Sequence, residues 1–121
     1  MIEASCHCGA VRFEIAAVPK SVTDCNCSIC RKKGVLWAYY PREQVRIIAT
    51  EGATSTYRWN HEVIDFHTCQ TCGCTTHYVP LRKHAHEDMA VNARLMDPAV
   101  LAAAELEHFD GATLMRLRQS S

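Results

Sequence analysis

Eight cysteines in three tight clusters limit the fold of this 121-residue sequence more than any other feature. The clusters have the patterns CxC, CxCxxC and CxxCGC. In chain order they are Cys6 and Cys8; Cys25, Cys27 and Cys30; and Cys69, Cys72 and Cys74. A disulfide framework spreads its partners over the chain, whereas tight clusters in a reducing cytosol are typical of thiolate metal ligands. The sequence therefore predicts a zinc protein with reduced cysteines.

Composition and hydropathy indicate where the protein is located and which partners it binds. Met1 leads into a polar run, Glu3 to Ser5, without the apolar segment of a signal peptide. No stretch approaches the roughly 18 to 20 apolar residues of a membrane span. We therefore expect a cytoplasmic protein that binds no membrane. The 13 basic and 13 acidic residues cancel, which argues against a nucleic-acid partner but leaves an anionic small-molecule ligand possible.

Hydrophobic patterning predicts short strands. Val11, Phe13 and Ile15 alternate with polar residues, as in a half-buried strand, and the residues before the turn at 6–9 are its expected hairpin partner. Further strand-like runs lie at residues 36–40, 45–49, 54–59, 62–68, 75–79 and 89–93.

Two short helices are expected, at residues 28–33 and 99–105. Asp97 and Pro98 provide the N-cap and the first position of the second helix. The whole pattern predicts one mainly β domain over residues 1–121, built of short antiparallel strands with one or two short helices.

The outer clusters suit a structural zinc, which takes four ligands in a closed tetrahedron. Cys6 and Cys8 would provide two ligands, and Cys69 and Cys72 two more. Such a site ties the first hairpin to a distant strand. Its loss should therefore unfold the domain, since metal binding is part of folding here.

The middle cluster differs in kind, because Cys25, Cys27 and Cys30 lie on one short loop. Three protein ligands with an open fourth position are typical of a catalytic zinc. The alternative is a second structural site completed by Cys74 or by a histidine such as His67 or His77. Spacing alone leaves both arrangements open.

Three motifs resemble those of the glutathione-dependent formaldehyde-activating enzyme family, which includes the centromere protein V domain. They are SCHCGAVRFE from Ser5, CNCSICRKKG from Cys25 and HTCQTCGCTTH from His67. Their order and intervals match over nearly the whole chain. The resemblance implies a β-tent fold and formation of S-hydroxymethylglutathione from glutathione and formaldehyde, a carbon–sulfur lyase run in reverse. It also implies two zinc ions, a structural one on Cys6, Cys8, Cys69 and Cys72 and a catalytic one on Cys25, Cys27 and Cys30.

The implied chemistry favours thiol activation. A zinc held by three thiolates carries a net charge of −1 and polarises a carbonyl poorly, whereas a thiol bound to it loses its proton. Arg31, Lys32 and Lys33 directly follow the last thiolate. We expect them to offset the negative charge and to attract the carboxylates of glutathione. The alternative is a solvated basic turn without a ligand.

Other residues have weaker assignments. The aromatic run Trp37, Tyr39 and Tyr40 suits the core or a strand face better than a substrate wall. His77 is a candidate to reach the second site. Asp65 and Glu62 are expected to be surface charges.

Cys74 is where spacing and resemblance disagree. Side chains two apart in an extended strand share a face, which would bring Cys74 near the structural zinc with Cys72. We expect it to be a free thiol beside the active site and no ligand.

Two other functions remain open. One is a non-catalytic zinc module that binds a partner, and the other is thiol redox chemistry, which lacks the usual βαβ surroundings here.

Overall fold

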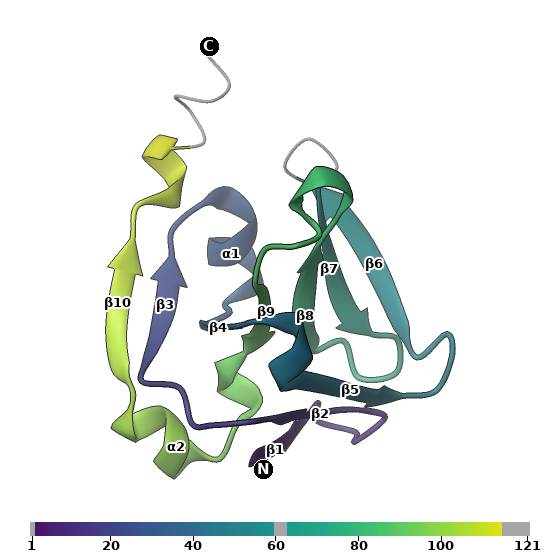
Figure 1. The fold of residues 1–121 in the computed structure, drawn as a ribbon. Helices are drawn as coiled ribbons and strands as arrows, with labels where there is room; N and C mark the ends of the chain where they lie inside the picture. The colour runs from purple at the N-terminus through teal and green to yellow at the C-terminus, as the bar shows by residue number, and fades with distance from the viewer. Residues whose placement is uncertain (1, 60–62, 115–121) are drawn as a thin grey trace.

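Short strands dominate the computed structural model of the protein, which describes residues 2–59 and 63–114 (Figure 1). The strands are β1 (Ile2–Ser5), β2 (Val11–Ile15), β3 (Ser21–Cys25), β4 (Trp37–Tyr40), β5 (Val45–Ala49), β6 (Thr54–Trp59), β7 (Ile64–Cys69), β8 (Thr75–Pro80), β9 (Met89–Asn92) and β10 (Glu105–Phe109). The α-helices are α1 (Ser28–Lys33) and α2 (Pro98–Ala103), and the 3-10 helices are Arg42–Gln44, Arg82–His84 and Ala93–Leu95. Residues 111–114 are also helical. The predicted mainly β class is confirmed.

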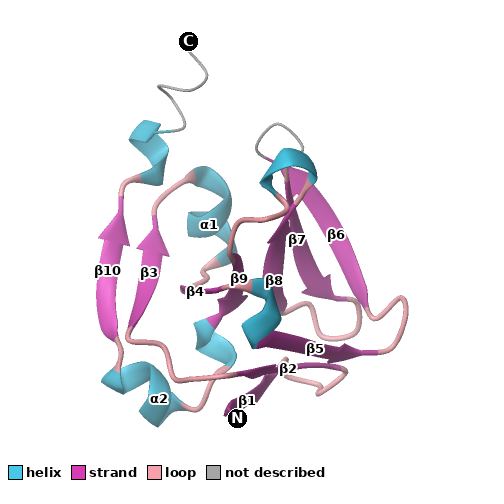
Figure 2. Ribbon diagram, viewed as in Figure 1, coloured by secondary structure: helices cyan, strands magenta, loops and turns pink. Residues whose placement is uncertain are grey.

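The strands form two sheets that are largely antiparallel. The smaller has the order β1-β2-β5, and the larger has the order β10-β3-β4-β9-β8-β7-β6. In Figure 2 the smaller sheet lies across the lower end of the larger one. The pairing of β10 with β3 is parallel, unlike the other pairings between described strands. This arrangement places α1 and its preceding loop beside the middle of the larger sheet (Figure 1).

The main core fills the space between the two sheets. Val11, Phe13 and Ile15 on β2 are fully buried while Arg12 is exposed, so the alternation read from the sequence is the real inward face. Phe13 and Ile15 pack in one cluster with Val91 of β9 and other apolar residues. Apolar burial of this kind is the dominant stabilising contribution.

Seven of the expected strands are present within two residues of their predicted bounds, as is the hairpin partner β1, which pairs Ala4 with Phe13. The 28–33 helix is confirmed as α1. The Asp97 cap is also confirmed, because its carboxylate accepts the Ala99 N–H at 2.8 Å.

The predicted end of the second helix was wrong. It stops at Ala103, because Glu105 begins β10 and pairs with Ser21 of β3. Among the described residues, no helix is long and apolar enough to cross a membrane.

Candidate metal centres

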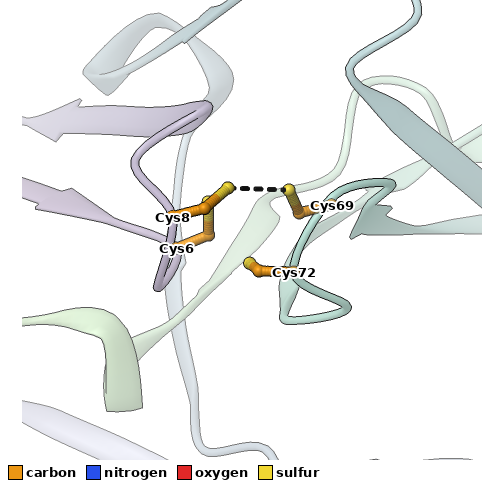
Figure 3. A group of neighbouring side chains, drawn as sticks. All are labelled: Cys6, Cys8, Cys69 and Cys72. Atoms are coloured by element: carbon orange, nitrogen blue, oxygen red, sulfur yellow. Dashed lines mark hydrogen bonds between the residues drawn. The ribbon is translucent and has the colours of Figure 1, made fainter.

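Four cysteines meet where the smaller sheet touches the turn between β7 and β8. Cys6 and Cys8 lie in the β1–β2 turn and face Cys69 and Cys72 (Figure 3). All four sulfurs lie within 4.8 Å of one another, with Sγ–Sγ distances of 3.7 Å for Cys6–Cys8 and 3.6 Å for Cys8–Cys69. A tetrahedral zinc with Zn–S near 2.3 Å separates its ligand sulfurs by about 3.8 Å. The donor set and its spacing therefore fit one zinc.

Backbone N–H groups prepare these sulfurs to be thiolates. The Val11 N–H donates to Cys6 Sγ at 3.4 Å. The N–H groups of Cys74 and Cys8 lower the pKa of Cys72 to about 5, since they favour its charged form. Gly73 follows at φ 81°, a left-handed conformation that glycine adopts without the steric cost of a side chain.

A second group, Cys25, Cys27 and Cys30, forms where β3 passes into α1. Cys25 ends β3, Cys27 caps α1 and Cys30 lies within that helix. Their sulfurs are within 4.8 Å of one another and all three residues are buried. Neither Cys74 nor a histidine among the described residues joins this group, so its donor set is three sulfurs.

The electrostatics of this group suit a cation among the sulfurs. The thiols of Cys25 and Cys30 donate to Cys27 and lower its pKa, helped by the N–H groups of Cys30 and Ile29. Donation of its thiol to Cys25 and to Cys27 raises the pKa of Cys30, whose sulfur also accepts the Trp37 indole N–H at 3.3 Å. The three cysteines therefore accommodate one thiolate without a counter-ion, whereas three neighbouring thiolates would repel one another unless a cation lay between them. A soft divalent ion such as zinc fits this requirement.

A cavity of about 250 Å³ opens over the three sulfurs. Its wall is largely aromatic: Trp37, Tyr39, Trp59, Phe66, Tyr78 and Phe109. Trp37 and Tyr78 meet edge to face with ring centroids 4.9 Å apart, so the wall is a packed structure. The three cysteines line this cavity, and a ligand inside it can therefore reach them.

The segment after β10 closes one side of the three-cysteine site. Asn26, between two of the cysteines, donates its backbone N–H to Phe109 O at 3.2 Å and its amide to Asp110 Oδ1 at 3.2 Å. Its side-chain oxygen accepts the Ala112 N–H at 2.9 Å. A Cβ at Gly111 would lie 2.5 Å from Cys25 Sγ, so only glycine permits this close approach. Asn26 and Gly111 were not predicted, because the contact depends on a distant segment.

Cys74 lies at the four-cysteine group. It packs against the cluster of Cys6 and Cys69, and its sulfur accepts the His7 N–H. Its position near the four-cysteine group agrees with the outcome of the same-face argument, although Cys72 lies in a turn before Gly73 and not in an extended strand. The expected position of Cys74 beside the middle cluster was wrong, since it does not line the cavity. It is outside both ligand groups.

The predicted basic residues follow Cys30 on α1 but do not line the cavity. Arg31 and Lys32 are exposed. Lys33 is half-buried, and its ammonium donates to Thr75 Oγ1 at 3.4 Å.

The aromatic run on β4 serves both faces of its strand. Trp37 and Tyr39 both line the cavity; Trp37 is buried, as predicted for a core residue, and Tyr39 lies exposed on the strand face. Tyr40 points into the main core, where its hydroxyl donates to Ala17 O at 2.9 Å.

Two polar residues have structural roles instead. His77 is buried on β8 and stacks on His67, with ring centroids 4.3 Å apart, and does not line the cavity. Asp65 was expected at the surface but is buried, and it pairs with Arg58 at 2.8 Å and 3.2 Å. Glu62 lies outside the described residues.

A family model and a curated relative name the same family, and a solved structure has a similar fold. A family model described as "Glutathione-dependent formaldehyde-activating enzyme" matches residues 1–111. A protein of Halomonas elongata whose curated name assigns it provisionally to the same enzyme is 54% identical over 33 residues, which cover 26% of this chain and 21% of the relative. A crystal structure of a Rhodobacter sphaeroides protein superposes with a TM-score of 0.70 at 25% identity, covering 87% of this chain and 99% of that one.

Proposed function

Because the chain belongs to the glutathione-dependent formaldehyde-activating enzyme family, we propose that it forms or cleaves the carbon–sulfur bond of a thiol–aldehyde adduct at its three-cysteine site. The observation that carries this proposal is the position of Cys25, Cys27 and Cys30. They form a three-donor group that lines the aromatic cavity, whereas the four cysteines of the other group are not among the residues that line it. S-hydroxymethylglutathione, the adduct of the two compounds in the family name, is the first substrate to test.

The two sites divide the work in this proposal. Cys6, Cys8, Cys69 and Cys72 hold a structural zinc that joins the two sheets. Cys25, Cys27 and Cys30 would hold a catalytic zinc, which would lower the pKa of a substrate thiol. The chain's own residues would form the aromatic wall of that site and supply a proton donor.

The reaction balances without an external oxidant or reductant. In the forward direction the thiol S–H bond breaks, the sulfur electron pair attacks the aldehyde carbon and a C–S bond forms. The carbonyl π pair moves to the oxygen, which takes up a proton to give the hydroxyl group of the adduct. The lyase direction reverses each step.

Tyr39 is the best-placed donor for that oxygen. Desolvation, with the nearby sulfurs of Cys25 and Cys30, raises the pKa of Tyr39 to about 12, so its phenol stays protonated near neutral pH. Its oxygen accepts hydrogen bonds from Tyr78 and Thr23, which leaves its own O–H to donate into the cavity. Such a donor stabilises charge that develops on the oxygen during attack.

The test is exchange between adduct and free aldehyde, followed by NMR with zinc-loaded protein, glutathione and formaldehyde, and then with other small thiols. Wild-type protein should accelerate exchange for at least one thiol. Cys27→Ser should abolish the acceleration, and Tyr39→Phe should reduce it at least about 100-fold. Cys74→Ser is the matched control, because that thiol lies outside the cavity.

Two zinc ions per chain without acceleration for any thiol would overturn the proposal. That result would instead favour a non-catalytic zinc module.

A further inference from the structure

The cavity over Cys25, Cys27 and Cys30 has a chemical character that the family name does not describe. We infer that the thiol taken by this site is small and apolar, with a ring-sized body, and that glutathione is a poor ligand. This inference rests on the proposed function, because it names the substrate class of the same site.

The first argument is charge. No Lys, Arg, Asp or Glu is found among the described residues that line the cavity. Glutathione carries two carboxylates and an ammonium group, and burying them without partners costs several kcal/mol. Among the cations nearest in sequence, Arg31 and Lys32 are exposed. The Lys33 ammonium donates to Thr75 and lies 6.0 Å from the centroid of the Phe66 ring, but Lys33 does not line the cavity.

The second argument is the placement of polar groups. The three sulfurs are available at the floor of the cavity, whereas the Trp37 N–H is already donated to Cys30 and the Tyr78 hydroxyl to Tyr39. The Tyr39 O–H is reserved for the oxygen of the adduct. A ligand that matches this pattern has one sulfur head and an apolar body.

The third argument is size and shape. An apolar cavity of roughly 150 Å³ is enough to hold benzene. The space of about 250 Å³ therefore accepts a single ring with its thiol-bearing carbon. The edge-to-face pair of Trp37 and Tyr78, at 4.9 Å, and the Tyr39–Tyr78 pair, at 6.4 Å, present ring surfaces against which such a body can pack.

Intrinsic fluorescence tests the inference directly, since the chain has two tryptophans and both line the cavity. Zinc-loaded protein is titrated with phenylmethanethiol, glutathione and toluene. We expect phenylmethanethiol to bind at least tenfold more tightly than glutathione. Burial of about 55 Å² of apolar surface lowers the dissociation constant about tenfold, and a phenyl ring buries a larger area.

Each outcome separates this inference from the proposed function. Glutathione binding as tightly as phenylmethanethiol, or an absence of fluorescence change with every probe, overturns the inference. The NMR exchange experiment still decides the proposed function in either case. Toluene binding as tightly as phenylmethanethiol supports the apolar cavity and removes support for thiol activation.

A matched pair of variants locates the effect. Leu114 lines the cavity and Leu106 lies on β10 outside it, and both are partly exposed, at 37% and 52%. Leu114→Arg should reduce the preference for phenylmethanethiol over glutathione about tenfold, because it adds a cation to the cavity wall. Leu106→Arg should leave the preference unchanged. Equal effects of the two substitutions would contradict the assignment of the cavity as the binding site.

Discussion

His77 should make the stability of this protein fall as the pH drops below neutrality. Its side chain is 4% exposed, its Nδ1 lies 2.8 Å from Thr76 Oγ1, and its ring stacks on His67. Burial, reinforced by the neighbouring His67, lowers the pKa of His77 to about 3. In the unfolded chain a histidine titrates near 6.5, so the two states bind protons differently between these values.

The sign and size follow from this difference. Because the folded pKa is the lower one, the unfolded state gains a proton first, and stability is lost as pH falls below about 6.5. Between pH 7 and pH 5.5 the contribution of His77 is about 1.3 kcal/mol, and between pH 7 and pH 3 it would reach about 4 kcal/mol. The first interval is the useful one, since zinc release competes at stronger acidity.

The assay is urea denaturation of the zinc-loaded protein at pH 7 and pH 5.5 with constant free zinc. His77→Asn is less stable at both pH values but should lose about 1.3 kcal/mol less than wild type over this interval. His86→Asn is the control, and it should keep the wild-type pH dependence because its side chain is exposed. An identical pH dependence in His77→Asn and wild type would refute the reasoning.

Four further substitutions test the two proposed metal sites. Cys69→Ser should abolish cooperative unfolding, whereas Cys27→Ser should keep the fold and lose one zinc; equal losses of thermal stability would contradict the division into structural and catalytic sites. Gly111→Ala should speed zinc loss from the second site to a chelator at least tenfold, because its Cβ would meet Cys25 Sγ at 2.5 Å, and an unchanged release rate would argue against this contact. Cys74→Ser should retain two zinc ions by metal analysis, and a drop to one would make Cys74 a ligand.

The sequence predicted those elements whose pattern is contained within a short stretch of the chain. The alternation at Val11, Phe13 and Ile15 identifies β2, because a strand with one buried face repeats every two residues. The cysteine spacings likewise predicted both groups of sulfurs, because the cysteines within each cluster are separated by only one or two residues. Asp97 marks the start of α2 through the side-chain acceptor that a helix N-terminus requires.

The parts that failed depend on pairing between distant segments. All five residues of β10 are exposed, so no alternation marks it, and only its parallel register with β3 makes it a strand. The cavity is equally non-local: Trp37 and Tyr39 share one strand face, but Trp59 and Phe109 come from opposite edge strands of the larger sheet. The position of Cys74 was missed because the Gly73 turn keeps it beside the first group.

The segment around Gly111 covers one side of the three-cysteine group and is synthesised late. The two cysteine groups are therefore completed at different times during translation. The last ligand of the first site is Cys72, whereas the wall of the second site requires residues up to Leu114. At about 5–20 residues per second, the ribosome needs about 2–8 s to travel from Cys72 to Gly111. During that interval the chain already contains all four sulfurs of the first group, while Cys25, Cys27 and Cys30 still lack their last wall. A metal ion that reached the nascent chain in this interval would therefore meet the second group without its final cover.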